Sequence, residues 1–163
     1  MEKTAVKKSN KTISAFEKKM KIRKAKKQDF KYMAQILKTE YRKAPWNEKW
    51  TEKQALKTIL YLSKIGIIHV AEINNKIAGF IICRTEPWAE GSYLVIEEFV
   101  VDSKYQRKGI GKALIKKIEE YSRKSKVKVI YFTTHRKAPA VKFYKKMGYT
   151  PSKEAVIFGK KLK

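Results

Sequence analysis

Two closely spaced glycines stand at the mouth of an expected helix, in the run Gln106-Arg107-Lys108-Gly109-Ile110-Gly111-Lys112-Ala113. The apolar residues before the run are typical of a strand end, and Leu114 and Ile118 after it continue at a helical period. Glycine lets the backbone approach a ligand closely, and the free N–H groups of a helix start favour an anion. The run therefore predicts a phosphate-binding turn, although such glycine pairs also serve as ordinary tight turns.

Two adjacent carboxylates, Glu97 and Glu98, come just before this run in an expected strand over residues 93–101. A carboxylate can accept a proton directly or through one water, and a tyrosine such as Tyr144 can supply one. Side chains alternate along a strand, so we expect the two carboxylates on opposite faces of the sheet. The alternative is that they are only solvated or ion-paired, and that Tyr144 packs with its tip in water.

Alternating helical and strand patterns surround these residues and predict a mixed α/β chain. Asp29 is expected to cap the first helix, Thr51 and Gln54 to form a capping box at the second, and Gly66 to end it. Asn74-Asn75 fits a two-residue hairpin turn. The expected strands cover 21–25, 67–73, 76–84, 93–101, 127–133 and 155–158, and the expected helices begin near residues 30, 52, 110 and 139.

The glycine run differs from the Walker loop and from the dinucleotide fingerprint, because it lacks a Gly-Lys-Ser/Thr string and a third spaced glycine. It resembles the (Gln/Arg)-x-x-Gly-x-(Gly/Ala) pyrophosphate loop of the GNAT superfamily of acetyl-CoA-dependent N-acetyltransferases. A second run, Phe143-Tyr144-Lys145-Lys146-Met147-Gly148-Tyr149, resembles the family's Phe-Tyr-x-x-x-Gly-Phe/Tyr signature. The resemblance covers roughly residues 21–162.

The resemblance implies an α/β GNAT-type fold, with a mixed central sheet of about six to seven strands flanked by about four helices. It implies an N-acetyltransferase domain over residues 21–163, and the lysine-rich residues 1–20 before it read as a flexible basic arm. Acetyl-CoA would be the acyl donor, with direct attack by an amine in a ternary complex and no metal. The acceptor stays open between a protein N-terminus, a lysine and a small amine.

Roles carry over from the family position by position. Glu97 is the implied base, with Glu98 second, and Tyr144 would point its hydroxyl at the coenzyme sulfur. Trp46 and Trp50 would border the acceptor pocket, or else pack over the core. The cofactor would be held by the backbone of Phe99, Val100 and Val101, by the loop residues Gln106, Arg107, Lys108, Gly109, Ile110, Gly111 and Lys112, and by Lys137, which stands where the family often has asparagine.

The 163 residues suit one domain, and their 40 basic against 15 acidic side chains give a formal charge of +25. Such a charge supports salt-sensitive nucleic-acid binding, so the alternative function is a nucleic-acid- or ribosome-associated module with little or no catalysis. It also fits a merely solvated lysine-rich surface. Cys83 is the single cysteine, which fits a reducing compartment and a core position. No apolar stretch is long enough to span a membrane, so a cytoplasmic location is expected, with the oligomeric state open.

Overall fold

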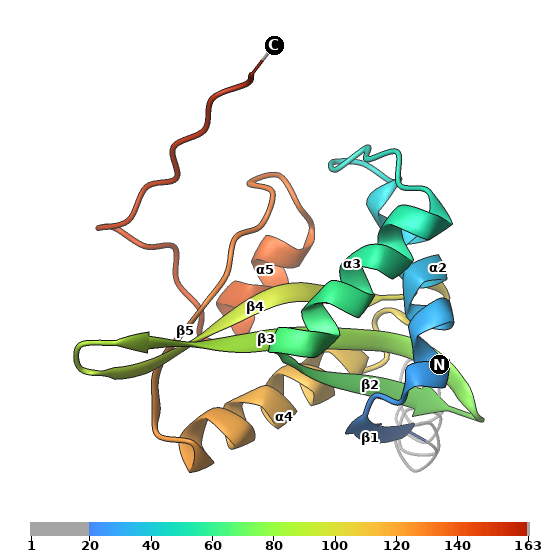
Figure 1. The fold of residues 1–163 in the computed structure, drawn as a ribbon, viewed down its shortest axis with the longest axis horizontal. Coiled ribbons are helices and arrows are strands. Elements are labelled where there is room, and N and C mark those ends of the chain that lie inside the picture. The colour runs from blue at the N-terminus through green and yellow to red at the C-terminus, as the bar shows by residue number, and fades with distance from the viewer. Residues whose placement is uncertain (1–19, 163) are drawn as a thin grey trace, which may run out of the picture.

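The computed structural model describes residues 20–162, so the predicted arm over residues 1–20 lies almost wholly outside the described part of the chain. Its sheet is mixed (Figure 1): the pairs β1–β2, β2–β3 and β3–β4 are antiparallel, whereas the pair β4–β5 is parallel. The five strands follow the chain order across the sheet: β1 (Met20–Lys24), β2 (Ile67–Ile73), β3 (Lys76–Trp88), β4 (Gly91–Val101) and β5 (Val127–Tyr131).

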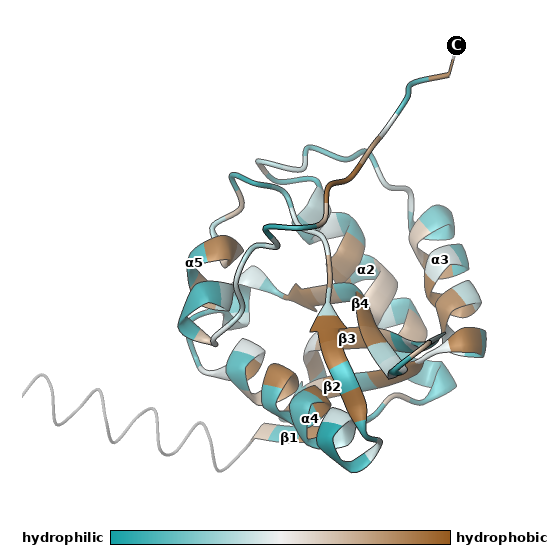
Figure 2. Cartoon of the chain, turned by 90° about the vertical axis from the view of Figure 1, so that its left-hand side faces the viewer, coloured by the Kyte–Doolittle hydropathy of each residue, from teal (hydrophilic) through white to brown (hydrophobic). Residues whose placement is uncertain are grey.

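Helices cover both faces of this sheet. Helices α2 (Phe30–Tyr41) and α3 (Glu52–Ile65) share one apolar core with Val70 and Phe80 of the sheet. Helix α4 (Ile110–Lys124) packs on the opposite face, and α5 (Ala140–Lys146) follows β5. Two short 3-10 turns, Lys27–Asp29 and Ser103–Tyr105, complete the described elements. Figure 2 shows the central strands mainly in the hydrophobic colour and α4 in both colours, as burial on one side requires.

The local start and turn signals were largely right. Thr51 and Gln54 form the predicted capping box, in which the Gln54 N–H donates to Thr51 Oγ1 at 3.2 Å and the Thr51 N–H donates to Gln54 Oε1 at 2.9 Å. Asn74 and Asn75 both have positive φ, 49° and 61°, as a tight hairpin turn requires. The four α-helices match the predicted number, and the order of elements matches up to α5.

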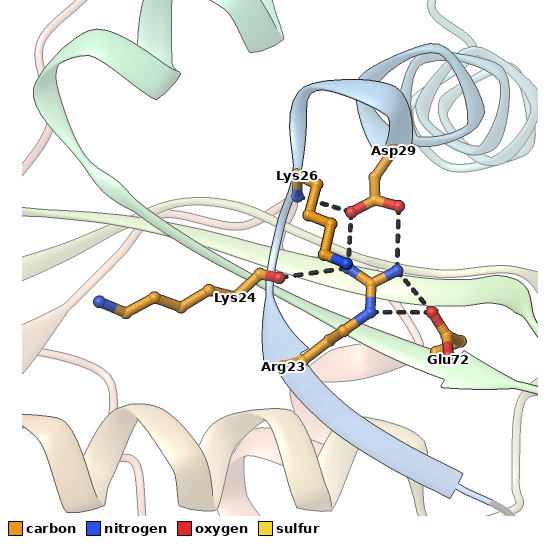
Figure 3. Close-up of polar contacts among 5 residues, drawn as sticks. All are labelled: Arg23, Lys24, Lys26, Asp29 and Glu72. Carbon is orange, nitrogen blue, oxygen red and sulfur yellow. Dashed lines mark hydrogen bonds and ion pairs between the residues drawn. The ribbon is translucent and has the colours of Figure 1, made fainter.

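The predicted role of Asp29 as the side-chain cap of α2 was wrong, because its carboxylate binds elsewhere. Asp29 stands at the N-cap position of α2, but its side chain makes no capping hydrogen bond there, and its Oδ2 accepts from the backbone N–H of Lys26 at 2.6 Å and from Arg23 at 2.7 Å. Figure 3 shows the Arg23 guanidinium between the carboxylates of Asp29 and Glu72. This cluster joins β1, β2 and the start of α2, and only 5% of the Asp29 side chain is exposed.

The predicted closing strand over residues 155–158 was also wrong, and the sheet has five strands rather than six to seven. Residues 150–162 run away from the sheet (Figure 1), and Val156, Ile157 and Phe158 are 73%, 78% and 89% exposed. These residues have strand propensity, but a strand forms only where its main chain pairs with an edge. Pro151 at the start of this segment also lacks the N–H that a ladder needs.

Gly66 tests the close packing between the end of α3 and the sheet. A Cβ atom at this position would lie 2.5 Å from the backbone oxygen of Cys83, which a backbone atom cannot relieve by rotating. We expect Gly66→Ala to lower the free energy of unfolding by about 1–3 kcal/mol, the usual effect of overpacking. Urea unfolding measures it, with Gly159→Ala as the control because nothing lies within 4 Å of a Cβ there. Equal midpoints for the two variants would contradict the close approach.

Candidate active site

The glycine run forms the connection from β4 to α4. Arg107 and Gly109 both adopt positive φ, 63° and 82°, and α4 begins at the next residue, Ile110. The N–H of Ala113 donates to the Gly109 carbonyl at 3.0 Å, so the three N–H groups before it have no acceptor inside the helix. The Gln106 side chain donates to the Val101 carbonyl at 2.9 Å and ties the loop to the end of β4. The loop therefore has the geometry of an anion site at a helix N-terminus.

Strand β4 loses one of its neighbours before it reaches this loop. It pairs with β5 only from Ser92 to Val95, and from there to Val101 the described residues pair it with β3 alone. Phe99 lies in this second half, and its ring packs against Phe143 and Tyr144 of α5 at centroid distances of 6.0 and 6.1 Å. One edge of β4 next to the glycine loop is thus not used for pairing with β5.

A β-bulge at Glu97 changes the expected directions of the two carboxylates. Cys83 of β3 lies opposite Ile96, but Ile82 lies opposite Glu98, so Glu97 is the extra residue of β4. The expectation of opposite faces was wrong, because the bulge interrupts the alternation. Glu98 binds Tyr41 of α2, so it points to the α2 side of the sheet. Arg84 also points to the α2 side, because its neighbour Cys83 packs on the α4 side, and Glu97 binds Arg84.

Glu98 is the better placed of the two for proton transfer. Its Oε2 accepts a hydrogen bond from the Tyr41 hydroxyl at 2.6 Å. Burial raises the pKa of Glu98 to about 7, and the Tyr41 hydrogen bond opposes that rise while Glu48 and Glu97 add to it. Glu97 is instead ion-paired with Arg84, which also binds Glu86. A carboxyl that titrates near neutral pH suits a general base.

Tyr144 lies in an aromatic cluster at the end of β5. Its ring packs on Phe132 at 4.5 Å, on Phe143 at 5.5 Å and on Phe99 at 6.1 Å between centroids. Burial raises the pKa of Tyr144 to about 12, so the hydroxyl keeps its proton at neutral pH. Tyr144 also raises the pKa of Tyr41 electrostatically, so the fold brings α5 and the Glu98 partner into one neighbourhood.

The two tryptophans predicted for the acceptor side lie beside Tyr41 and Glu48. Trp46 packs on the Tyr41 ring at 5.7 Å, and the Trp50 indole N–H donates to the Glu48 carboxylate. Glu48 and Trp50 line a shallow surface hollow. Both tryptophans are half-buried: Trp50 packs against the core beneath α2 and α3, and Trp46 packs on Tyr41.

Lys137 and His135 lie in the exposed loop between β5 and α5, where the Lys137 N–H donates to His135 Nδ1 at 3.1 Å. Cys83 and His69 are buried, and burial raises the pKa of the Cys83 thiol and lowers that of His69. A buried thiol with a raised pKa is a poor nucleophile. Residues 20–162 contain no group of His, Cys, Asp or Glu side chains arranged to hold a metal.

Tyr41 is the residue of this site that the sequence did not reveal. It continues the apolar stripe of α2 after Phe30, Met33 and Leu37, so its spacing indicated only a core position. Glu98 lies 57 residues further along the chain, so no local pattern indicated that it is the partner of Tyr41. The contact follows from the packing of α2 across β4, which no local pattern encodes.

The model of the acetyltransferase (GNAT) family matches residues 30–149, which include the glycine loop, both carboxylates and the Phe-Tyr motif. The chain belongs to the GNAT acetyltransferase family. No similar protein was found among curated proteins. None of the helices that the structure describes is both long and apolar enough to cross a membrane.

Solved structures of other GNAT-like proteins share the fold at low sequence identity. A possible acetyltransferase from Clostridium difficile 630 is 18% identical with a TM-score of 0.76, over 88% of this chain and 99% of that one. An aminoglycoside acetyltransferase from an uncultured soil metagenomic sample, in complex with sisomicin, is 19% identical with a TM-score of 0.71, over 91% and 99%. Glucosamine-6-phosphate N-acetyltransferase from Arabidopsis thaliana is 20% identical with a TM-score of 0.68, over 88% and 99%.

Proposed function

We propose that this GNAT protein transfers an acetyl group from acetyl-CoA to an amine by direct attack in a ternary complex. The observation that carries the proposal is Glu98, a buried carboxyl with a pKa of about 7 that is bound by Tyr41 and lies on the strand leading into the family's glycine loop. The GNAT family uses acetyl-CoA, and the three N–H groups at the start of α4 that have no acceptor inside the helix suit a pyrophosphate. The turn at Arg107 and Gly109 would hold the pyrophosphate, and the edge of β4 over Phe99–Val101 would hold the pantetheine arm.

The two titratable groups divide the proton transfers between them. The thioester supplies the acetyl group, and the amine nitrogen forms the new bond to its carbonyl carbon as the bond to sulfur breaks. Glu98, about half ionised at pH 7 and more so above it, accepts the proton that the amine loses, directly or through one water. Tyr144, protonated at neutral pH, gives a proton to the departing sulfur. Glu97, which was the first choice from sequence, is proposed as a neighbour that orients Arg84.

Binding of acetyl-CoA by calorimetry tests the donor site, and Gly109→Ala is the variant to use. Gly109 and Gly148 both have left-handed φ, 82° and 90°, so alanine strains the backbone at both positions. Only Gly109 lies in the loop, and a Cβ at Gly148 meets nothing within 4 Å. We expect Gly109→Ala to weaken acetyl-CoA binding at least about tenfold, or ~1.4 kcal/mol, and Gly148→Ala to leave it unchanged.

A panel of amine acceptors, with release of free coenzyme A as the readout, tests the reaction itself. It should include peptides with a free N-terminus, peptides with one lysine, and small amines. A wild-type chain that binds no acetyl-CoA would overturn the proposal. The nucleic-acid or ribosome association expected from the +25 charge stays a prediction.

A further inference from the structure

We propose that Tyr41 is the positioning residue of this site, and that its hydroxyl orients the Glu98 carboxylate and sets the pH range in which Glu98 accepts a proton. The inference rests on the proposed function, because it makes Glu98 the base. It assigns a role on a helix that carries neither the glycine loop nor the Phe-Tyr motif. Its direct observation is the 2.6 Å hydrogen bond from Tyr41 Oη to Glu98 Oε2.

Hydrogen bonds join the end of α2 to the β4–α4 connection, and they restrict the position of Tyr41. The buried Glu40 carboxylate accepts from the Ser103 N–H at 3.0 Å and from Lys43 Nζ at 2.7 Å. Lys43 Nζ also donates to Ser103 Oγ at 2.8 Å. These contacts join the last turn of α2 to the 3-10 turn that precedes the glycine loop. Tyr41 therefore cannot move without disturbing the connection that leads to α4.

The chain after α2 folds back over Tyr41 from the other side. The Glu48 N–H donates to the Tyr41 carbonyl at 2.9 Å, and the Trp46 ring packs on the Tyr41 ring at 5.7 Å. A ring with a fixed position loses little entropy when its hydroxyl binds an acceptor. Tyr41 is thus pre-organised to hold Glu98 in one orientation.

The groups around Glu98 act on its ionisation in opposite directions. Glu48 from the loop after α2 and Glu97 from β4 itself are negative neighbours, and both raise the pKa of Glu98, as burial does. Arg84 of β3 lies on the same face of the sheet and is ion-paired with Glu97 and Glu86. Tyr144 of α5 is neutral near pH 7. The Tyr41 hydroxyl is the contact that lowers the pKa of Glu98, so it is the one that keeps the carboxylate ionised near neutrality.

Tyr41→Phe removes this hydroxyl and keeps the ring that packs on Trp46. The titration midpoint of the Glu98 carboxyl, followed by ¹³C NMR and assigned by its absence in Glu98→Gln, should rise from near 7 by about one unit. On one acceptor, kcat/KM at pH 7 should fall about fivefold relative to wild type and recover at about pH 9, since one unit is a tenfold change in proton affinity. The amine's own titration cancels in this ratio.

Tyr32→Phe is the matched control, because Tyr32 lies on the same helix and is 59% exposed. It should leave both the midpoint and the pH profile unchanged. An unchanged Glu98 midpoint in Tyr41→Phe, or a loss of rate that does not recover at high pH, would overturn the inference. A shifted midpoint in a chain that acetylates no amine would reject the proposed reaction while confirming that Tyr41 controls Glu98, so the two failures are distinguishable.

Discussion

Glu98→Gln should lower kcat/KM for acetyl transfer by about 10²–10⁴-fold, the usual contribution of a positioned general base. Glutamine keeps the shape of the side chain and can still accept the hydrogen bond from Tyr41, but it cannot take a proton at neutral pH. Binding of acetyl-CoA, measured by calorimetry, should be unchanged because the glycine loop is intact. Steady-state release of coenzyme A on the best acceptor of the amine panel measures the loss.

The same substitution should make the protein more stable at neutral pH. Burial raises the pKa of Glu98 from 4.5 to about 7, so between these values the folded state binds more protons than the unfolded state. Stability from this group therefore falls as pH rises through that window. The stability of Glu98→Gln relative to wild type should increase by about 3 kcal/mol between pH 4.5 and pH 8, because one pKa unit corresponds to about 1.36 kcal/mol.

Glu97→Gln is the control for both effects. Glu97 is paired with Arg84, so its loss should weaken that pair and cost less than about tenfold in kcat/KM. A loss for Glu97→Gln as large as that for Glu98→Gln would return Glu97 to the role of base. A stability difference for Glu98→Gln that does not change with pH would contradict the raised pKa.

Arg23→Met should lower the free energy of unfolding by about 3–5 kcal/mol, the usual result of removing one partner from a buried ion pair. The guanidinium donates to both oxygens of Asp29, at 2.7 and 3.0 Å, and to Glu72. Methionine keeps the aliphatic bulk but leaves the Asp29 carboxylate buried without its cation. Urea unfolding at neutral pH measures the loss, and Lys21→Met at an exposed position of the same strand is the control.

The pH dependence gives this prediction a second test. Arg23 and the Lys26 N–H hold the pKa of Asp29 below its usual 3.8, against the effect of burial. The stability that Asp29 contributes is therefore present above its unfolded pKa and is lost as the pH falls through the lower folded value. The difference between wild type and Arg23→Met should shrink in acid. A constant difference down to about pH 2 would show that packing, and not charge, holds this corner together.

Local sequence signals predicted much of the fold, including the glycine turn at the start of α4. The helix starts at Thr51 and Gly109 and the turn at Asn74 each depend on residues within four positions of one another, so their types alone are informative. The Phe-Tyr motif predicted α5 for the same reason. The family match over residues 30–149 confirms the resemblance that these motifs indicated.

The contacts that the sequence did not predict depend on long-range packing. Tyr41 and Glu98 are 57 residues apart, and Arg23 and Glu72 are 49 apart, so no local pattern pairs them. The expected strand over residues 155–158 failed for a related reason, because strand propensity does not say whether an edge is paired. The expectation that Glu97 and Glu98 point to opposite faces failed because one extra residue in β4 breaks the strict alternation on which it rested.

That extra residue has a consequence for how the protein can change by mutation. Leu94, Ile96, Phe99 and Val101 all pack in the core cluster on the α4 side of the sheet. Successive members are two residues apart except Ile96 and Phe99, which are three apart because Glu97 is the extra residue. Loss of the single codon for Glu97 would leave each of these apolar side chains on its present face and return β4 to regular alternation. The side of β4 that faces α2 can therefore gain or lose a carboxylate through a one-codon insertion or deletion, without a compensating change in the core.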